Sequence, residues 1–322
     1  MKTFSNLDYN EQVVLFDKVK ELKRSGLCYK RIIKRIKIEA DVRLSLGTLS
    51  YWFNNDVKML GGENQFKEEP SKELAYVLGV MFGDGCLNLC IKNQDYNLQL
   101  VAKDRDFVEK FSRDGSTLLK KERPYSVCIK NRIGYSTMYS TQIRSKQLYY
   151  FIKSIKEDFE KGKPFIEKFP AEFVQGLADS EGSAIGCVSK TFRVSVDVAN
   201  SANLRLLESV EKLLVKRFKI KSCLRKVKSA GESDSIIDGR IITRTKNVYR
   251  LTVRRFEDVV KYSNLIGFGI GRKETKLIDS IFLLKKFGSR SAGDFWKKIY
   301  YKEGRYWIRS NNIRINKLQL SS

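Results

Sequence analysis

The chain has 322 residues, 42% of them hydrophobic, which is enough for one large core or two smaller ones. Lys and Arg number 62 against 37 Asp and Glu, a formal charge of +25, so a polyanionic partner is the first to consider; ribosome association, membrane-surface binding and a Lys-rich codon bias are the ordinary alternatives. The chain has no histidine and its six cysteines form no C-x-x-C pair, which disfavours a structural zinc site and excludes histidine-based catalysis.

Residues 1–58 are predicted to form a small all-α domain with helices over residues 11–25, 29–36 and 45–54. Gly26 stands where a helix cap is expected. The layout resembles a helix-turn-helix, although the link over residues 37–44 is longer than usual. The third helix would then be the recognition helix, with three side chains available to a DNA groove: Thr48, Ser50 and Tyr51. An ordinary helical adaptor is the alternative.

Residues 59–71, with Gly61, Gly62 and Pro70, have the composition of a linker. After it, one order of elements occurs twice, over residues 72–168 and 169–286, which indicates an internal duplication. In the first copy we expect strands over 86–92, 96–103, 125–132 and 136–144 and helices over 104–121 and 145–161. In the second copy we expect helices over 171–181, 202–218, 256–266 and 273–286 and strands over 184–190, 192–200, 221–228 and 240–255.

Two stretches, residues 74–85 and 172–182, anchor the duplication. Each reads as a helix with small residues four apart, namely Gly79 with Gly83 and Gly176 with Ser180. This spacing predicts two helices whose backbones approach closely. Each stretch ends on an acid and a glycine, and we expect the glycine to end the helix in the left-handed conformation.

The two acids, Asp84 and Glu181, would face the negative ends of their helix dipoles, an arrangement that costs about 0.3–1 kcal/mol for each surface group. Finding it twice argues for a role other than stability. If the helices pack side by side, the two carboxylates meet, and divalent cations would relieve their repulsion. Carboxylates around Mg²⁺ are what in-line phosphodiester hydrolysis requires.

These stretches resemble the two motifs of the LAGLIDADG family of homing endonucleases, over residues 77–85 and 174–182. The resemblance implies an α+β fold of two pseudo-symmetric αββαββα repeats that form a DNA-binding saddle. It also implies that Asp84 and Glu181 bind metal, with the preceding Gly83 and Ser180 contributing carbonyl oxygens or supporting contacts. The motifs depart from the family pattern at Leu78, Phe82 and Gln175, while Asp179 keeps the first acidic position in the second copy.

The family usually places a basic residue from each repeat beside the scissile phosphate. By position, Lys273 is the candidate in the second repeat and Lys161 or Lys163 in the first. Lys103 and Asn200, at the ends of the second strands, would help to order the attacking water. A solvated surface position is the alternative for each.

Alternate residues of the predicted strand over 240–255 would place five basic groups on one face of a sheet: Arg240, Arg244, Lys246, Arg250 and Arg254. Arg225 on the neighbouring strand would extend this surface, and the first repeat would add Lys130, Arg132, Gln142 and Arg144. Such side chains read base edges in the major groove. A solvated face of a thermostable protein is the alternative. The basic, aromatic-rich residues 287–322 predict a folded appendage.

Most of the six cysteines lie in apolar, strand-like runs, which predicts reduced thiols packed in an intracellular core. We see no N-terminal signal peptide, and apolar runs such as residues 75–82 are far shorter than the roughly 20 residues that span a bilayer. We therefore expect a protein of the cytoplasm or an organelle matrix with no membrane partner.

The function expected is that of a monomeric, site-specific double-stranded DNA endonuclease that uses Mg²⁺, with Mn²⁺ as a substitute. A DNA-binding regulator that has lost cleavage and an intron maturase that binds RNA are the alternatives. An intein is disfavoured because the chain has no histidine for splicing chemistry.

Overall fold

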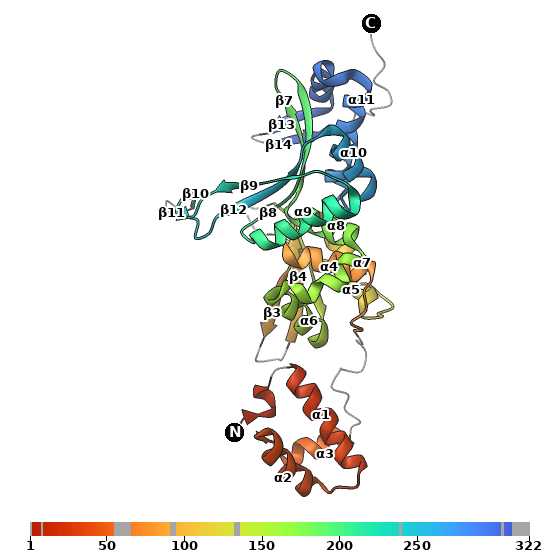
Figure 1. Ribbon diagram of the computed structural model, residues 1–322, viewed down its shortest axis with the longest axis vertical. Helices are drawn as coiled ribbons and strands as arrows, with labels where there is room; N and C mark the ends of the chain where they lie inside the picture. Colours follow the sequence, from red (N-terminus) through yellow and green to blue (C-terminus); the bar gives the residue numbers. More distant parts are fainter. Residues whose placement is uncertain are drawn as a thin grey trace.

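The computed structural model describes residues 2–7, 9–54, 66–90, 95–131, 136–237, 240–303 and 306–310 (Figure 1). The N-terminal domain consists of β1 (Lys2–Thr3), η1 (Phe4–Asn6), α1 (Tyr9–Arg24), α2 (Tyr29–Ala40), β2 (Val42–Arg43) and α3 (Leu46–Asn54). The predicted three-helix core is confirmed, with Phe16, Ile32 and Trp52 buried at its centre. The long link expected before the third helix is wrong, because α2 continues to Ala40 and ends where Asp41 adopts a left-handed conformation.

A polar contact joins this domain to the rest of the chain. Lys146 Nζ donates to Gln12 Oε1 at 2.6 Å, while the buried Gln12 amide donates to the carbonyls of Phe4 and Leu7. Most of the predicted linker, including Gly61 and Gly62, lies outside the described residues. Its end is not free, since Phe66 is buried against Phe151.

The first repeat contains α4 (Lys72–Phe82), β3 (Cys86–Cys90), β4 (Asp95–Ala102), α5 (Arg105–Leu118), β5 (Cys128–Lys130), β6 (Met138–Arg144), α6 (Lys146–Glu157), η3 (Phe159–Gly162) and α7 (Lys163–Lys168). The second contains α8 (Pro170–Glu181), β7 (Ser183–Val188), β8 (Phe192–Ser201), α9 (Leu204–Phe218), β9 (Cys223–Lys228), β12 (Val248–Val253), α10 (Phe256–Leu265) and α11 (Gly271–Ile299). Each repeat has one four-stranded antiparallel sheet, ordered β3-β4-β6-β5 and β7-β8-β12-β9. The predicted pair of αββαββα repeats is confirmed.

One face of each sheet packs on the helices, because alternate strand residues such as Leu98, Val196 and Leu251 are buried in a core that the two repeats share. The residues that alternate with them form the opposite side of each sheet, called the open face below. α4 and α8 lie side by side in the middle of the molecule (Figure 1).

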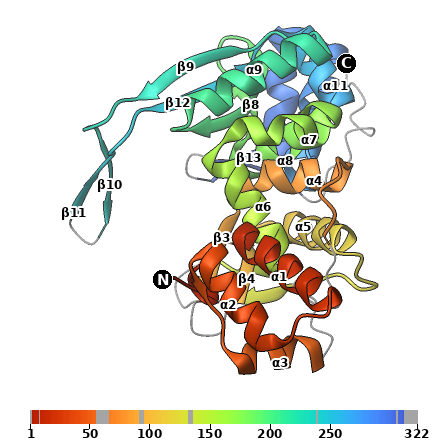
Figure 2. The same cartoon turned by 60° about the horizontal axis from the view of Figure 1, so that its bottom comes forward.

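The single strand predicted over residues 240–255 is wrong. β11 (Arg240–Thr243) pairs with β10 (Ser233–Ile237) in a separate two-stranded sheet, and only β12 belongs to the main sheet. Figure 2 shows β9 and β12 leading into this hairpin, called the arm, which projects away from the second sheet.

The described residues of the C-terminal segment include regular secondary structure. α11 kinks at Gly288, where φ is +69°, and is followed by β13 (Tyr300–Glu303) and β14 (Tyr306–Arg309). Trp296 stacks on Tyr300 and packs against Gly186 and Phe192 of the second sheet. Within the described part of the chain, no helix has the length and apolarity required to cross a membrane.

Candidate active site between the motif helices

The two motif helices touch backbone to backbone. A methyl group at Gly79 would overlap the carbonyl oxygen of Phe173 and lie 2.8 Å from Leu177 N. A methyl group at Gly176 would overlap the carbonyl oxygen of Tyr76 and lie 3.1 Å from Val80 N. The close approach predicted from the small residues is therefore confirmed, and glycine is required at both positions.

The glycines that follow the acids have a different role from the one expected. Neither Gly85 nor Gly182 adopts a positive φ, so the predicted left-handed helix stop is wrong. A side chain at Gly182 would lie 2.8 Å from the carbonyl oxygen of Asp197, and one at Gly85 would lie 2.6 Å from Met81 Sδ. Lack of space, and not backbone conformation, requires glycine there.

The two acids lie together at one end of the helix pair. Glu181 is the last residue of α8, whereas α4 ends at Phe82 and Asp84 follows it in a turn. Burial raises the pKa of Glu181, and the negative charge of Asp84 raises it further. Burial also raises the pKa of Asp84. The ammonium group of Lys273 partly offsets both pKa shifts, so one buried cation acts on both carboxylates.

Lys273 is almost completely buried in the first turns of α11. Its Nζ donates to the carbonyls of Ala178 (3.1 Å) and Asp179, near the end of α8. Burial lowers its pKa to about 8. The predicted lysine of the second repeat thus lies near both acids, where it binds the carbonyl end of their helix.

The first repeat has a matching contact that the sequence did not predict. Lys156 Nζ donates to the carbonyl of Met81, which occupies the same motif position as Ala178. Burial lowers the pKa of Lys156, as it does for Lys273. The sequence analysis placed the basic residue of the first repeat at Lys161 or Lys163, after the preceding helix. Lys156 lies within that helix, α6, and was therefore not considered.

The other lysines proposed for the site have different neighbours. Lys163 pairs with Glu160 and lines a hollow of about 630 Å³ between α7 and α9. Lys161 is exposed in η3. Lys103 is exposed just after β4, where its charge acts on Asp104. The structure does not bring these three lysines into contact with Asp84 or Glu181 within the described residues.

Asn200 reaches the site as expected. Its side-chain amide donates to the backbone carbonyl of Glu181 at 3.4 Å, and its Oδ1 accepts from Arg250 Nε at 2.7 Å. Gly83 and Ser180 face each other across the helix pair, since a side chain on Gly83 would overlap Ser180. Ser180 Oγ donates to the carbonyl of Gly176.

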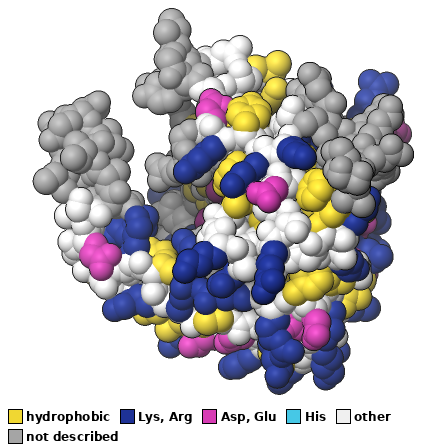
Figure 3. All heavy atoms as spheres, turned by 90° about the horizontal axis from the view of Figure 1, so that it is seen from above, with side chains coloured by type: hydrophobic (Ala, Val, Ile, Leu, Met, Phe, Trp, Pro, Cys, Tyr) yellow, Lys and Arg dark blue, Asp and Glu magenta, His cyan; other side chains and the backbone are white. Residues whose placement is uncertain are grey.

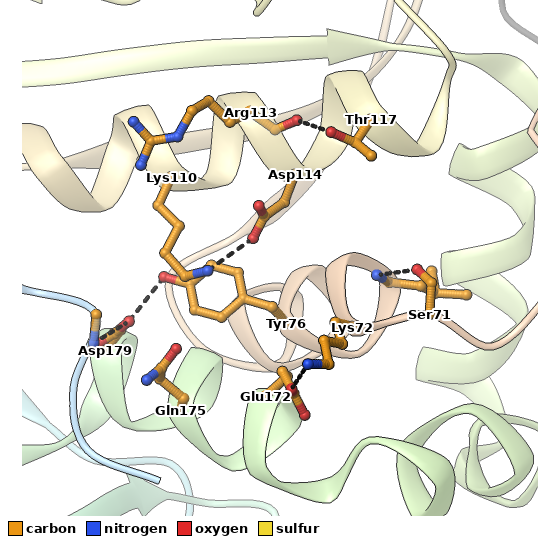
Figure 4. A network of polar contacts seen from close by, with 12 residues as sticks. Ser71, Lys72, Tyr76, Lys110, Arg113, Asp114, Thr117, Glu172, Gln175 and Asp179 are labelled. Atoms are coloured by element: carbon orange, nitrogen blue, oxygen red, sulfur yellow. Dashed lines mark hydrogen bonds and ion pairs between the residues drawn. The ribbon is translucent and has the colours of Figure 1, made fainter.

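The departure at Phe82 has a structural reason. On one side of the helix pair, Tyr76 Oη donates to Asp179 Oδ2 at 2.8 Å, while Lys110 lies over the Tyr76 ring and bonds Asp114 (Figure 4). On the other side, Phe173 and Phe82 occupy the positions equivalent to Tyr76 and Asp179, each 97 residues away in sequence. Their rings pack edge to face, with 6.2 Å between the ring centroids. The acid and its tyrosine are replaced together by two phenylalanines.

Asp179 also holds the segment before α11. Its carboxylate accepts hydrogen bonds from the backbone N–H groups of Gly269 (2.9 Å) and Ile270 (3.3 Å). Burial raises its pKa to about 6 despite these bonds. The neighbouring Arg272 makes a bidentate contact with Asp104 of the first repeat at 2.8 and 2.9 Å. Asp179 thereby positions the turn that carries Lys273.

Gln175 explains a second departure, because its amide donates to the carbonyl of Ile266 at 2.8 Å and so ties α8 to the end of α10. The equivalent Leu78 is fully buried in the shared core. Both residues therefore serve the packing of their own motif helix.

The donor set fits a hard divalent cation. Two carboxylates with raised pKa values, from two chain segments that converge, supply the oxygen ligands that Mg²⁺ prefers, and a cation would favour their ionised forms. Among the described residues no group of three or more His, Cys, Asp or Glu side chains could hold a metal by itself. The remaining ligands would have to be backbone carbonyls, water or phosphate oxygens.

Part of the chain matches a described protein family. Residues 168–267 match the family model described as a LAGLIDADG-like domain. Residues 168–267 are called the LAGLIDADG-like domain below, after this match. This domain covers α8 with Glu181, the second sheet and α10, and the first repeat carries the same order of elements around Asp84.

Two curated relatives are uncharacterized proteins of Methanocaldococcus jannaschii. One is 29% identical over 278 residues, which cover 86% of this chain and 96% of the relative. The other is 34% identical over 118 residues, which cover 36% of this chain and 43% of the relative. Solved structures with similar folds include the homing endonuclease I-DmoI (21% identity, 61% of this chain and 94% of that one, TM-score 0.39). Another is I-WcaI bound to its DNA recognition sequence (14% identity, 76% and 98%, TM-score 0.45).

The open face of the first repeat gathers three predicted DNA-binding side chains. Lys130, Gln142 and Arg144 line one hollow of about 550 Å³ over β5 and β6. Asn88 and Gln99 add a bonded amide pair on the same face. Arg132 lies outside the described residues.

The open face of the LAGLIDADG-like domain is organised differently. Arg225 and Arg250 are directly opposite each other on β9 and β12. Arg250 contacts Asp197 at 3.4 Å as well as Asn200, so it is committed to a network that leads to the Glu181 backbone. Arg244 and Lys246 lie in the base of the arm, while Arg240 is in β11 and its side chain lies outside the described residues. Arg254 follows β12 and lines a hollow with Phe256 and Leu284.

The prediction of five basic residues on one strand face is therefore wrong, because the chain leaves the main sheet at the arm. Lys and Arg side chains nevertheless far outnumber acidic ones among the described residues on the surface seen from above the second repeat (Figure 3).

On α3, Tyr51 is 61% exposed, whereas Thr48 and Ser50 are half-buried. Ser45 Oγ accepts from Thr48 N and so begins the helix. Leu46, the first residue of α3, is exposed as well. This leaves an outward face on α3 of mixed apolar and polar character.

The prediction of cysteines packed in the core is wrong. All six are free and exposed. In the strands the apolar neighbours of each cysteine, and not the thiol itself, face the core, because alternate residues point to opposite sides of the sheet.

Proposed function

We propose that this chain is a double-stranded DNA endonuclease that hydrolyses phosphodiester bonds between the ends of α4 and α8 and uses Mg²⁺, with Mn²⁺ as a substitute. The observation that carries the proposal is the convergence of Asp84 and Glu181, whose pKa values burial raises, beside the buried ammonium of Lys273. Two such acids at matching positions in the two repeats argue for a functional role.

The residues would divide the reaction as follows. Asp84 and Glu181 would hold the cation, which supplies an activated water and stabilises the leaving oxygen. Asn200 would orient the water, since it is bonded to the Glu181 backbone and to Arg250. Lys273 and Lys156, each bonded to carbonyls at the end of a motif helix, would offset the negative dipole ends and the charge of the phosphate.

The open faces would bind the DNA. Lys130, Gln142 and Arg144 would contact one half-site and Arg225 with the arm the other. The N-terminal domain would contact a flanking sequence through α3. Its Gln12 is bonded to Lys146 of the first repeat, and the acids and both sheets lie outside the domain.

The test is cleavage of a target selected from a randomised DNA pool with Mg²⁺ present. We expect Asp84→Asn and Glu181→Gln each to abolish double-strand cleavage and to keep the affinity for DNA near that of the wild type, because they remove metal ligands and leave the open faces intact. Glu157→Gln, which changes an exposed acid at the end of α6, is the matched control and should cut normally. Cleavage by either site variant would contradict the assignment.

Two other outcomes would redirect the proposal. DNA binding by the wild type without cleavage of any selected site would indicate a regulator, and preferential binding of structured RNA would indicate a maturase. Deleting residues 1–58 should preserve cleavage and lower the salt dependence of binding, since each phosphate contact contributes about −0.9 to the log–log slope. Equal slopes and affinities would show that the N-terminal domain does not touch DNA.

A further inference from the structure

Five of the six thiols belong to the open faces, as the strand register shows. Their cross-strand partners are Gln99 for Cys86, Asp95 for Cys90, Ser140 for Cys128, Arg193 for Cys187 and Thr252 for Cys223. Since Leu98, Val194 and Leu251 in the adjacent register face the core, these cysteines point to the other side. All five are exposed.

This placement is unusual for the residue type. Free cysteine is among the most buried residues in proteins and usually behaves as a small apolar side chain. Cys90 and Cys187 occupy matching positions six residues after Asp84 and Glu181, so the placement occurs in both repeats. Cys128 lines the same hollow as Lys130 and Gln142. The thiols therefore lie among the groups that would face the DNA.

Cys86 is the thiol nearest the acids in sequence, two residues after Asp84. The second repeat has Ser183 at the equivalent position. The site has a nucleophile that the proposed hydrolysis does not use.

Resting on the proposed function, we propose that the open-face thiols form a modification site at which low-molecular-weight disulfides switch off DNA binding. The thiolate attacks one sulfur of a disulfide such as oxidised glutathione. A new sulfur–sulfur bond forms to the cysteine as the original one breaks, and the departing thiolate takes up the proton that the cysteine lost. The cysteine is oxidised and half of the disulfide is reduced.

The effect follows from charge and size. A glutathione adduct carries two carboxylates and one ammonium group, so it adds net negative charge to a face that would otherwise meet phosphates. It also holds the DNA away from the sheet. A reducing thiol reverses the reaction, because exchange at an exposed disulfide is accessible from solvent.

Cys28 provides an internal reference. It is exposed at the start of α2 in the N-terminal domain, away from both sheets, and a hydrogen bond from the backbone N–H of Arg31 lowers its pKa. Modification of Cys28 alone would leave the open faces unchanged. It therefore separates thiol chemistry in general from thiol chemistry at the proposed site.

The experiment treats the full chain with oxidised glutathione and measures its affinity for the selected target, with the adducts located by peptide mass spectrometry. We expect a loss of affinity on the order of tenfold or more, because the adducts oppose several phosphate contacts, and recovery on reduction. Target DNA added first should protect the open-face thiols. Full modification of these thiols with unchanged affinity would overturn the proposal.

Two variants complete the test, each compared with its own reduced form. Cys28→Ser should still lose affinity on treatment, whereas the chain with serine at all five open-face positions should not respond. A response in that second variant would overturn the proposal. If it does not fold, protection of the wild-type thiols by DNA decides the question. A reduced wild-type chain that binds no DNA would instead contradict the proposed function.

Discussion

The two sides of the helix pair are packed by different kinds of side chain, with hydrogen-bonded polar groups on one side and aromatic rings on the other. Beside one motif helix, Asp179 accepts hydrogen bonds from Tyr76 and from the turn before α11. Beside the other, Phe82 packs with Phe173 and Phe159. The polar side brings Arg272 onto Asp104 of the first repeat, and the aromatic side leaves a hollow between α7 and α9.

This difference separates what the site requires from what packing tolerates. Both repeats have the acid and the glycine at the helix contact, because the proposed metal site needs a carboxylate and the close helix contact leaves no room for a side chain. Positions one turn away can change if their partners across the interface change as well. The largest expected effects should therefore come from the shared features and the smaller ones from the features that differ.

The largest effect is expected at the shared glycines. Gly79→Ala would force a methyl group into the backbone of α8, and we expect a cost of about 3 kcal/mol or more. Gly47→Ala in α3 is the control: its methyl group would meet only Ser45 Oγ at 3.7 Å and should stabilise by about 0.5–1 kcal/mol. Urea denaturation measures both. Equal stability of Gly79→Ala and the wild type would refute the close contact.

The next effect compares the two lysines that are bonded to the motif helices, Lys273 and Lys156. Lys273→Met should reduce the cleavage rate on the order of 10²-fold, because it removes the cation that acts on both acids. Lys156→Met should reduce it less, because Lys156 is not among the charges that shift the pKa values of the two acids. Single-turnover cleavage on the selected target measures both, with Lys276→Met, further along α11, as the control. Identical losses at Lys273 and Lys156 would mean that the two halves are catalytically equivalent.

A double-mutant cycle tests the paired replacement directly. Phe82→Asp alone should cost about 1–3 kcal/mol, because a carboxylate in the aromatic cluster has no partner. Adding Phe173→Tyr recreates the pair found on the other side and should restore part of the lost stability. We expect a coupling free energy between the two substitutions of about 0.5–2 kcal/mol. Free energies of unfolding for the four proteins give the coupling. Additive effects would show that the two positions changed independently.

The smallest effect concerns pH. Burial raises the pKa of Asp179 to about 6 from its ordinary value of 3.8, so the folded state holds the proton more tightly than the unfolded state. Its contribution to stability is complete below pH 3.8 and is lost as the pH rises to 6, with a slope of at most about 1.4 kcal/mol per pH unit. Asp179→Asn should remove this component from unfolding curves measured between these values, and an unchanged slope would contradict the shift.

Local pattern was sufficient for much of the fold and for the centre of the site. The two motifs, their small residues and the repeated order of elements predicted both sheets and the pairing of α4 with α8. Helical and strand periodicity are properties of neighbouring residues, so they can be read from the chain. The acids could be chosen for the same reason, because they stand at fixed positions in the motif.

The features that the sequence missed depend on which distant segments meet. Nothing near Lys156 indicates that its ammonium reaches Met81, and nothing near Phe82 reveals that it faces Phe173. The break between β11 and β12 arises because residues 240–243 pair with β10 and not with the main sheet. The exposed cysteines were misjudged because an apolar run shows that a strand has a buried face, but only the register decides which side chains occupy it.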